Sequence, residues 1–206
     1  MPSRAYHEEL WRGLPSGLVP VQFELRLRFL LDAVPAGARV LDLGCGEGAF
    51  AAELAQAGAD VLCVDVAEEP LRRARAAHPE LRTQLIDGEG EWELADASFD
   101  AVWAGEVIEH VADTARWLSE LRRVLRSGGL LLLSTPQLGR AQLIEAAASP
   151  RAFAARFSPL DDHLRHYSEA TLSELISSFG FEQLSVRHAG RGAQRLLLLS
   201  ASRARF

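Results

Sequence analysis

The stretch "VLDLGCGEG", residues 40–48, decides the fold class of this chain. It joins a short apolar run to three glycines, Gly44, Gly46 and Gly48, and the helix-like segment "EGAFAAELAQAG" follows at 47–58. Glycines at the point where a strand turns into a helix permit a tight turn and let a ligand approach the backbone and the helix N-terminus. The stretch therefore predicts a strand, a ligand-binding loop and a helix, in that order.

An acidic residue accompanies the glycine loop. Asp65 lies near the end of the next apolar run, "DVLCVDV" at 60–66, where a carboxylate that accepts both hydroxyls of a ribose is expected. With Ala49 the loop also satisfies the dinucleotide pattern G-x-G-x-x-A. A structural glycine turn, with Asp65 capping a helix, is the alternative. Because strand, helix and acid agree, we favour a ligand that carries a ribose.

Strand-length apolar runs alternate with helix-period segments along most of the chain. We expect strands at 39–44, 60–66, 99–104, 130–135, 181–188 and 195–202, and helices at 47–58, 113–128 and 168–180. This alternation predicts an α/β fold with a Rossmann-like, mostly parallel sheet covered by helices on both faces. Only a hairpin-length connection separates the last two strands, so the sheet is expected to end antiparallel.

Composition narrows the class of protein. The chain has 206 residues, which we interpret as a single domain over 1–206. Its net charge is −6 and it has no basic stripe, which argues against DNA and RNA partners. No apolar run is long enough for a signal peptide or a membrane span, so we expect a cytoplasmic location and no membrane partner. The oligomeric state is not set by these features.

The sequence contains no lysine. This absence excludes a P-loop lysine, a Schiff-base lysine and the tyrosine–lysine pair of short-chain dehydrogenases. Longer dehydrogenases need a second substrate domain, for which the chain leaves little room. The dinucleotide-dependent oxidoreductase therefore becomes the weaker interpretation of the glycine loop.

Two segments lie outside the alternation. Residues 1–35 carry aromatic side chains on expected helices and are interpreted as an N-terminal helical cover. Tyr6 and Trp11 either close over the ligand or pack, and packing is the preferred interpretation for Trp11. Residues 136–167 are expected to be irregular and to follow a strand. Parallel sheets bind ligands at the carboxyl ends of their strands, so we interpret 136–167 as a substrate lid insertion, with a solvated surface as the alternative.

Four successive motifs resemble those of class I S-adenosylmethionine (SAM)-dependent methyltransferases, of the type that includes ubiquinone-biosynthesis O-methyltransferases. They are "VLDLGCGEG", "VDVAEEPLRRAR", "SFDAVWAGEVIEHVAD" and "ELRRVLRSGGLLLLSTP". The resemblance covers residues 39–188 and is specific for fold and cofactor but not for substrate. It implies SAM as the cofactor and a seven-stranded sheet whose last strand runs antiparallel.

The resemblance also implies roles at the methionine end of SAM. Gly44 and Gly46 would pass the backbone beneath the methionine moiety. Asp42 would hold the ammonium group, directly or through water. Glu106, just beyond the fourth strand of the family, would lie beside the same part of the ligand.

At the adenosine end, the resemblance implies four further residues. Asp65 would accept from the ribose hydroxyls, and Val66 would pack on the adenine. Asp87 would accept from the adenine amino group, with the Gly88 amide beside it. The sequence departs from the family's common form directly after Asp87, which weakens the last two assignments.

The stretch "GEVIEHV", residues 105–111, sets two carboxylates and an imidazole close together. In a helical turn Glu106, Glu109 and His110 would share one side, as i, i+3 and i+4 do. Such ligands suit a divalent ion, and the spacing resembles the metal motif of ubiquinone-pathway O-methyltransferases and small-RNA 2′-O-methyltransferases. Two alternatives need no metal: the stretch is only the polar start of a helix, or the His110 imidazole faces the substrate. We favour these alternatives, so a divalent metal is possible but not expected.

We therefore predict a SAM-dependent methyltransferase that acts on a small molecule, at oxygen. The candidate catalytic residues are His110, His163 and His166, the last two from the cluster "DDHLRHY" in the lid segment. A metal-dependent RNA 2′-O-methyltransferase is one alternative, against which the negative net charge counts. A SAM-binding module without turnover is the other.

Overall fold

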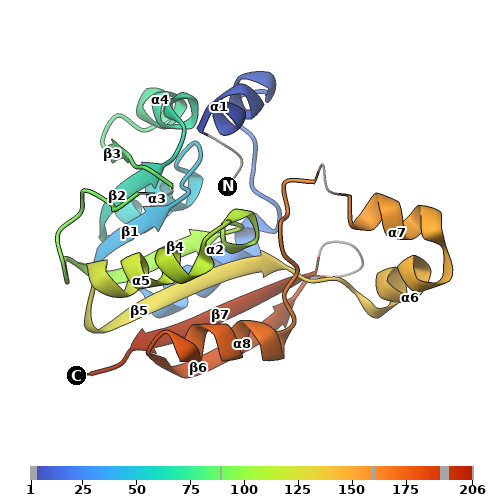
Figure 1. Cartoon of the computed structure of the whole chain (residues 1–206). Coiled ribbons are helices and arrows are strands. Elements are labelled where there is room, and N and C mark those ends of the chain that lie inside the picture. Colours follow the sequence, from blue (N-terminus) through green and yellow to red (C-terminus); the bar gives the residue numbers. More distant parts are fainter. Residues whose placement is uncertain (1–3, 89, 159–160, 191–194, 206) are drawn as a thin grey trace.

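One seven-stranded sheet organises the chain (Figure 1). The computed structural model describes residues 4–88, 90–158, 161–190 and 195–205. The strand order is β3-β2-β1-β4-β5-β7-β6, and β7 runs antiparallel between β5 and β6, whereas the other pairs are parallel. The strands are β1 Arg39–Leu43, β2 Asp60–Asp65, β3 Arg82–Leu85, β4 Phe99–Gly105, β5 Leu125–Pro136, β6 Phe181–Ala189 and β7 Leu196–Arg203. This topology confirms the predicted fold class.

Helices cover both faces of the sheet (Figure 1). They are α1 Arg4–Gly13, α2 Phe23–Ala33, α3 Ala49–Gln56, α4 Glu68–Ala77, a 3₁₀ turn η1 Ile108–His110, α5 Thr114–Val124, α6 Arg140–Ala148, α7 Pro150–Arg156 and α8 Glu169–Ser178. Leu41 and Leu43 of β1 pack in the core beneath α5 and α8, while Val40 packs with α2 and α3. Because β1 is buried on both faces, its apolar residues Val40, Leu41 and Leu43 contact both cores. No helix in the described ranges is long and apolar enough to cross a membrane.

The site lies where the strand order reverses. β1 pairs with β2 on one side and with β4 on the other. The chain first builds the sheet outward from β1 to β2 and β3, and then returns to the other side of β1 to form β4. In such sheets ligands bind outside the carboxyl ends of the strands at this switch point. Gly44, Asp65 and Glu106 follow or end these three strands, so one edge of the sheet collects them.

Two elements in the first half and middle of the chain differ from the sequence-based expectation. Strand β3 was not expected, because its residues "RTQL" carry no apolar run at this sheet edge. The helix expected at 113–128 begins after the Asp113 cap as predicted but ends at Val124. Leu125 is already extended, with φ −72° and ψ 137°, because it pairs with Phe99 in the sheet.

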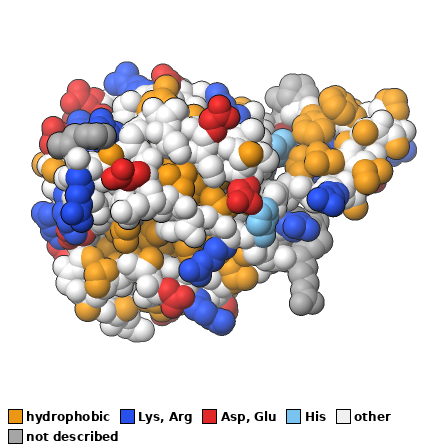
Figure 2. Space-filling view, turned by 90° about the horizontal axis from the view of Figure 1, so that it is seen from below, with side chains coloured by type: hydrophobic (Ala, Val, Ile, Leu, Met, Phe, Trp, Pro, Cys, Tyr) orange, Lys and Arg blue, Asp and Glu red, His pale blue; other side chains and the backbone are white. Residues whose placement is uncertain are grey.

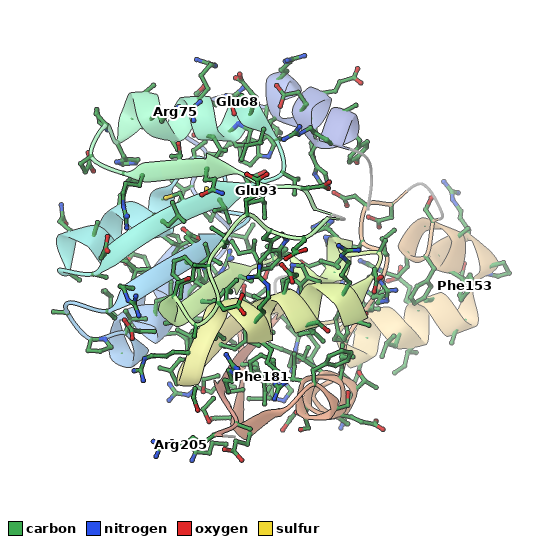
Figure 3. All side chains as sticks on the ribbon, turned by 60° about the vertical axis from the view of Figure 1, so that its left-hand side comes forward. Glu68, Arg75, Glu93, Phe153, Phe181 and Arg205 are labelled. Atoms are coloured by element: carbon green, nitrogen blue, oxygen red, sulfur yellow. The ribbon has the colours of Figure 1, made fainter. Side chains whose placement is uncertain are left out.

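The segment expected to be irregular contains helices α6 and α7, which project from the body of the molecule (Figure 1). Only Ala146 is buried in α6, and α7 has no buried residue. These helices form from alanine-rich sequence and from the Ser149 cap followed by Pro150, not from a core-facing stripe, and periodicity therefore missed them. Figure 2 shows apolar side chains on this projection, and Figure 3 shows Phe153 away from the sheet.

Candidate functional site

The glycine loop leaves no room for side chains. Gly44 and Gly46 have φ of 71° and 56°, a region that glycine adopts without strain. A Cβ on Gly44 would lie 2.6 Å from Cγ2 of Val107, and one on Gly46 would lie 3.0 Å from the Trp11 ring. The amide of Gly44 donates to the carbonyl of Val64 at 2.8 Å, which ties the loop to the end of β2. The loop therefore needs glycine at both positions.

Two cavities meet at this loop. The smaller, of about 220 Å³, includes Asp65, Val66, Ile86, Gly88, Trp92, Val107, His110 and Trp117 in its lining. The larger, of about 700 Å³, includes Arg26, Asp42, Gly46, Phe50, Trp103, His163 and His166. Trp11, Leu14, Gly44 and Glu106 line both cavities. A single extended ligand could thus lie along the loop with one end in each cavity.

Asp65 is buried at the base of the smaller cavity. Its carboxylate accepts from the amide of Gly46 at 3.2 Å and from the amide of Ala67 at 3.0 Å. Burial raises the pKa of Asp65 to about 6, although these two amides act in the opposite direction. A carboxylate at this place is a ready acceptor for hydroxyl groups of a ligand.

Asp42 and Arg26 face each other in the larger cavity. Burial raises the pKa of Asp42 to about 7, and the positive charge of Arg26 opposes this shift. Oδ2 of Asp42 is buried and has no hydrogen-bond partner among the described residues. The Arg26 guanidinium lies 4.7 Å from the centre of the Phe50 ring and 5.4 Å from that of Trp103, and it donates to the carbonyl of Val21. Sequence reasoning missed Arg26, which nothing in its local helical pattern sets apart.

Glu106 departs from ordinary backbone geometry. Its φ is 60°, a left-handed conformation that costs a non-glycine residue free energy and often accompanies function. The Ser134 hydroxyl donates to its Oε1 at 2.8 Å, and its amide donates to the Ser134 carbonyl at 2.9 Å. Burial raises the pKa of Glu106, with the charge of Arg26 acting against that shift. These contacts hold the carboxylate at the junction of the two cavities.

A second group of polar side chains lies beside this junction. Atoms of Glu109, His110 and His163 that could each bind a metal ion lie within 4.8 Å of one another. The Thr135 hydroxyl donates to Oε2 of Glu109 at 2.9 Å, while Oε1 has no hydrogen-bond partner among the described residues and lies 4.0 Å from Nε2 of His110. Burial, and then the charge of Glu106, raises the pKa of Glu109 to about 8. Glu106 itself is not in this group, because it precedes the 3₁₀ turn and bonds Ser134.

The histidines of the lid segment reach the site. The rings of His110 and His163 have centroids 4.8 Å apart, and His166 follows at 6.2 Å from His163. Nδ1 of His110 lies 3.0 Å from the carbonyl oxygen of Asp162. Burial lowers the pKa of His110 and of His166.

Most of the residues expected to bind the cofactor line the cavities. Asp42, Gly44, Gly46, Asp65, Val66, Gly88 and Glu106 do so. Asp87 does not: its side chain is exposed and it is absent from the lining of both cavities. Trp11 and Leu14, at the end of α1 and just beyond it, complete the enclosure.

Comparison with known proteins agrees with this geometry. Residues 41–133 match a family described as "Methyltransferase domain". The chain is 39% identical over 149 residues to a probable SAM-dependent methyltransferase of Mycolicibacterium smegmatis, which covers 71% of this chain and 53% of that protein. It is 36% identical over 141 residues to a ubiquinone biosynthesis O-methyltransferase of Xanthomonas oryzae, which covers 65% of this chain and 56% of that protein. The chain thus spans about half the length of the curated relatives it matches.

Solved structures share the fold. A SAM-dependent methyltransferase of Methanosarcina mazei superposes with a TM-score of 0.70 at 18% identity, covering 86% of this chain and 98% of that one. A phosphoethanolamine N-methyltransferase of Haemonchus contortus, solved with SAM, gives a TM-score of 0.70 at 17% identity, covering 97% of this chain and 56% of that one. The fold is the Rossmann-like fold that these methyltransferases share. Residues 41–133 belong to the methyltransferase domain family, and these relatives confirm the resemblance to class I SAM-dependent methyltransferases seen in the sequence.

Proposed function

We propose that this protein transfers a methyl group from SAM to a hydroxyl of a small-molecule acceptor. The observation that carries the proposal is the junction of the two cavities, where His110 lines one cavity and His163 lines the other. An acceptor in the larger cavity would lie against imidazoles and against the glycine loop at once. Alignment of two reactants in this way supplies much of the rate in group transfer.

The residues present fit SAM. A buried, unpartnered carboxylate oxygen on Asp42 suits an ammonium group, and Asp65 suits the ribose hydroxyls. Val66, Trp92 and Trp117 give the smaller cavity apolar surface for an adenine. When bound, SAM supplies an electrophilic methyl group on a sulfonium. The relatives named as SAM-dependent methyltransferases support the same cofactor for this chain.

His110 is proposed to remove or orient the acceptor's proton. If its Nδ1–H donates to the Asp162 carbonyl, Nε2 keeps a free lone pair. Because burial lowers its pKa, His110 is neutral at pH 7 and is ready to accept a proton. His163 and His166 are the alternative bases, placed on the other side of the junction.

A metal-assisted reaction is the second candidate, and the grouping of Glu109, His110 and His163 favours it. Two imidazoles and a carboxylate suit a borderline divalent ion with an open position for the acceptor. Three protein ligands are enough for a catalytic ion, so the geometry allows both reactions. We retain the metal-free reaction as our proposal, and sensitivity to EDTA distinguishes the two. The RNA 2′-O-methyltransferase alternative shares this metal, and the net charge of −6 counts against it.

Turnover tests the proposal against a SAM-binding module without catalysis. Labelled SAM is incubated with phenols, quinols, sugars, lipids and short RNAs, and S-adenosylhomocysteine is measured. We expect product only with hydroxylated small molecules. Tight SAM binding with no product from any acceptor would support the non-catalytic module, and product from RNA alone would support the RNA enzyme.

The lid makes a separate prediction. Residues 140–157 bury almost no side chains, so we expect their amides to exchange with solvent faster than those of 130–135 in the ligand-free protein. Exchange should slow when SAM and an acceptor are bound, because Gln142 and Arg156 line the larger cavity. Hydrogen exchange measured by mass spectrometry would contradict the lid if both segments were equally protected without ligand.

Proton release on SAM binding is a further expected result. Asp42 and Asp65, with pKa values of about 7 and about 6, are partly protonated near neutral pH. A cationic ligand beside Asp42 favours the charged carboxylate and lowers its pKa, so binding should expel protons. SAM affinity should therefore fall as the pH falls through about 7 to 6.

Calorimetry in two buffers of different ionisation enthalpy measures this release. Asp42→Asn should remove the protons that Asp42 releases on SAM binding. Asp60→Asn should leave the proton release unchanged, because Asp60 is exposed at the far end of β2. SAM affinity that stays constant over about two pH units, from about 5.5 to 7.5, would contradict the assignment of Asp42 and Asp65 to the SAM site.

A further inference from the structure

The lid forms a cationic wall on the larger cavity. Six residues form what we call the lid wall, because all line that cavity and come from the lid segment or from the position just before β7: Leu138, Arg156, Asp161, His163, His166 and Arg195. Near the glycine loop the same cavity is lined by the carboxylates of Asp42, Glu47 and Glu106, which outnumber the one cation there, Arg26. The two ends of one cavity thus differ in charge, although the whole chain carries −6.

Two arginines, Arg156 and Arg195, belong to the lid wall. Neither Arg156 nor Arg195 has a hydrogen-bond or ion-pair partner for its guanidinium among the described residues. Arg73 and Arg123, by contrast, each bind two carboxylates. Asp161, the acid of the lid wall, accepts from the amide of His163. The free guanidinium groups therefore face a cavity with no protein anion bound to them.

The fold fixes where these arginines lie. Pro136 pairs with Leu196, and the amide of Gln137 donates to the carbonyl of Arg195 at 2.8 Å, so Arg195 is placed at the base of the lid. Arg156 ends α7 near His166: burial lowers the pKa of His166, and the charge of Arg156 acts in the same direction. Both arginines thus lie on the side of the cavity that holds His163.

Apolar side chains contribute much of the cavity surface outside the lid wall, among them Phe50, Trp103 and Leu196. A guanidinium binds planar or tetrahedral oxyanions through paired N–H groups, in a geometry that carboxylates and phosphates share. An apolar cleft with free guanidinium groups at one end is complementary to an apolar compound with one anionic group.

We propose that the methyl acceptor carries an oxyanion, a carboxylate or a phosphate monoester, which Arg156 and Arg195 bind while its hydroxyl faces His110 and His163. This inference rests on the proposed function for the hydroxyl, but the anion site stands on the arginines alone. A neutral acceptor of the same shape would leave both guanidinium groups without a partner. Anionic acceptors should be preferred for this reason.

Binding of small probes tests the site without turnover. Benzoate, phenyl phosphate and neutral benzamide share one ring and differ in the charged group. Each is titrated by NMR into the protein saturated with S-adenosylhomocysteine, at low ionic strength. We expect at least one anion to bind about tenfold more tightly than benzamide, the scale of a charge-assisted hydrogen bond. Which anion binds more tightly identifies the oxyanion.

Variants assign the preference to the two residues. Arg156→Gln and Arg195→Gln should each reduce it severalfold and the double variant should abolish it, while SAM affinity stays unchanged. Arg151→Gln is the matched control, because Arg151 lies on the same helix but does not line the cavity. Equal binding of benzamide and both anions, or a preference that survives the double variant, would overturn the proposal. A preference without methyl transfer to any hydroxy acid would retain the anion site and refute the proposed function instead.

Discussion

Replacement of His110 by alanine is expected to lower the methyl-transfer rate by about 10²- to 10⁴-fold, the usual contribution of a positioned acid or base. SAM affinity should change far less, because His110 lies at the edge of the smaller cavity and not at its Asp65 base. Single-turnover rates and calorimetry measure the two quantities separately. His78→Ala is the control, since His78 lies beyond α4 and lines neither of these cavities.

Glu109→Gln distinguishes the base from a metal. The amide keeps an oxygen for the Thr135 hydroxyl but offers no anionic ligand to an ion. We expect a mild effect from this substitution and none from EDTA. Large losses from both Glu109→Gln and His110→Ala, with turnover lost in EDTA and restored by Mg²⁺, Mn²⁺ or Zn²⁺, would instead establish a metal site at Glu109, His110 and His163.

Asp65→Ala should weaken SAM binding by about 1.5–3 kcal/mol, which corresponds to about tenfold to 150-fold in Kd. The carboxylate of Asp65 is buried and lines the smaller cavity, where the other carboxylates are those of Glu106 and Asp162. The SAM affinity of Asp65→Asn should fall between those of the wild type and Asp65→Ala, because asparagine keeps one acceptor oxygen but not the charge. Calorimetry at pH 7.5 measures the affinities.

Thermal unfolding of the ligand-free variants provides the control for this prediction. Asp65 also accepts from the amides of Gly46 and Ala67, so its loss could loosen the loop. Unchanged SAM affinity in Asp65→Ala would remove this residue from the ribose role. A variant that unfolds at the wild-type temperature but loses affinity would assign the loss to the ligand contact.

Local patterns in the sequence were sufficient for the fold and for most of the cofactor pocket. The glycine spacing of residues 44–48 requires left-handed backbone, and the alternation of apolar runs with helix-period segments requires a covered parallel sheet. Asp65 follows from its place at the end of β2. Each of these inferences depends on neighbours in sequence, whose geometry the backbone sets within one or two elements.

Elements that bury little apolar surface escaped the same reasoning. β3 is a short polar edge strand, and its pairing with β2 is a long-range contact that no alternation signals. α6 and α7 face solvent on most sides, so no apolar stripe marks them. Helix propensity and a cap form such helices, and periodicity is a signal only where a core selects one face.

The arrangement of the site was decided by the tertiary structure. Arg26, His110 and His163 are separated by long stretches of chain, and only the packing of α2, η1 and the lid around the ends of β1 and β4 brings them to one junction. The sequence placed Glu106 with Glu109 and His110 as a helical turn, whereas a left-handed residue and a 3₁₀ turn direct Glu106 toward Ser134 instead. Spacing along a chain determines which residues share a regular element. Which elements face one another depends on the free energy of burying their apolar faces together, and that depends on the whole fold.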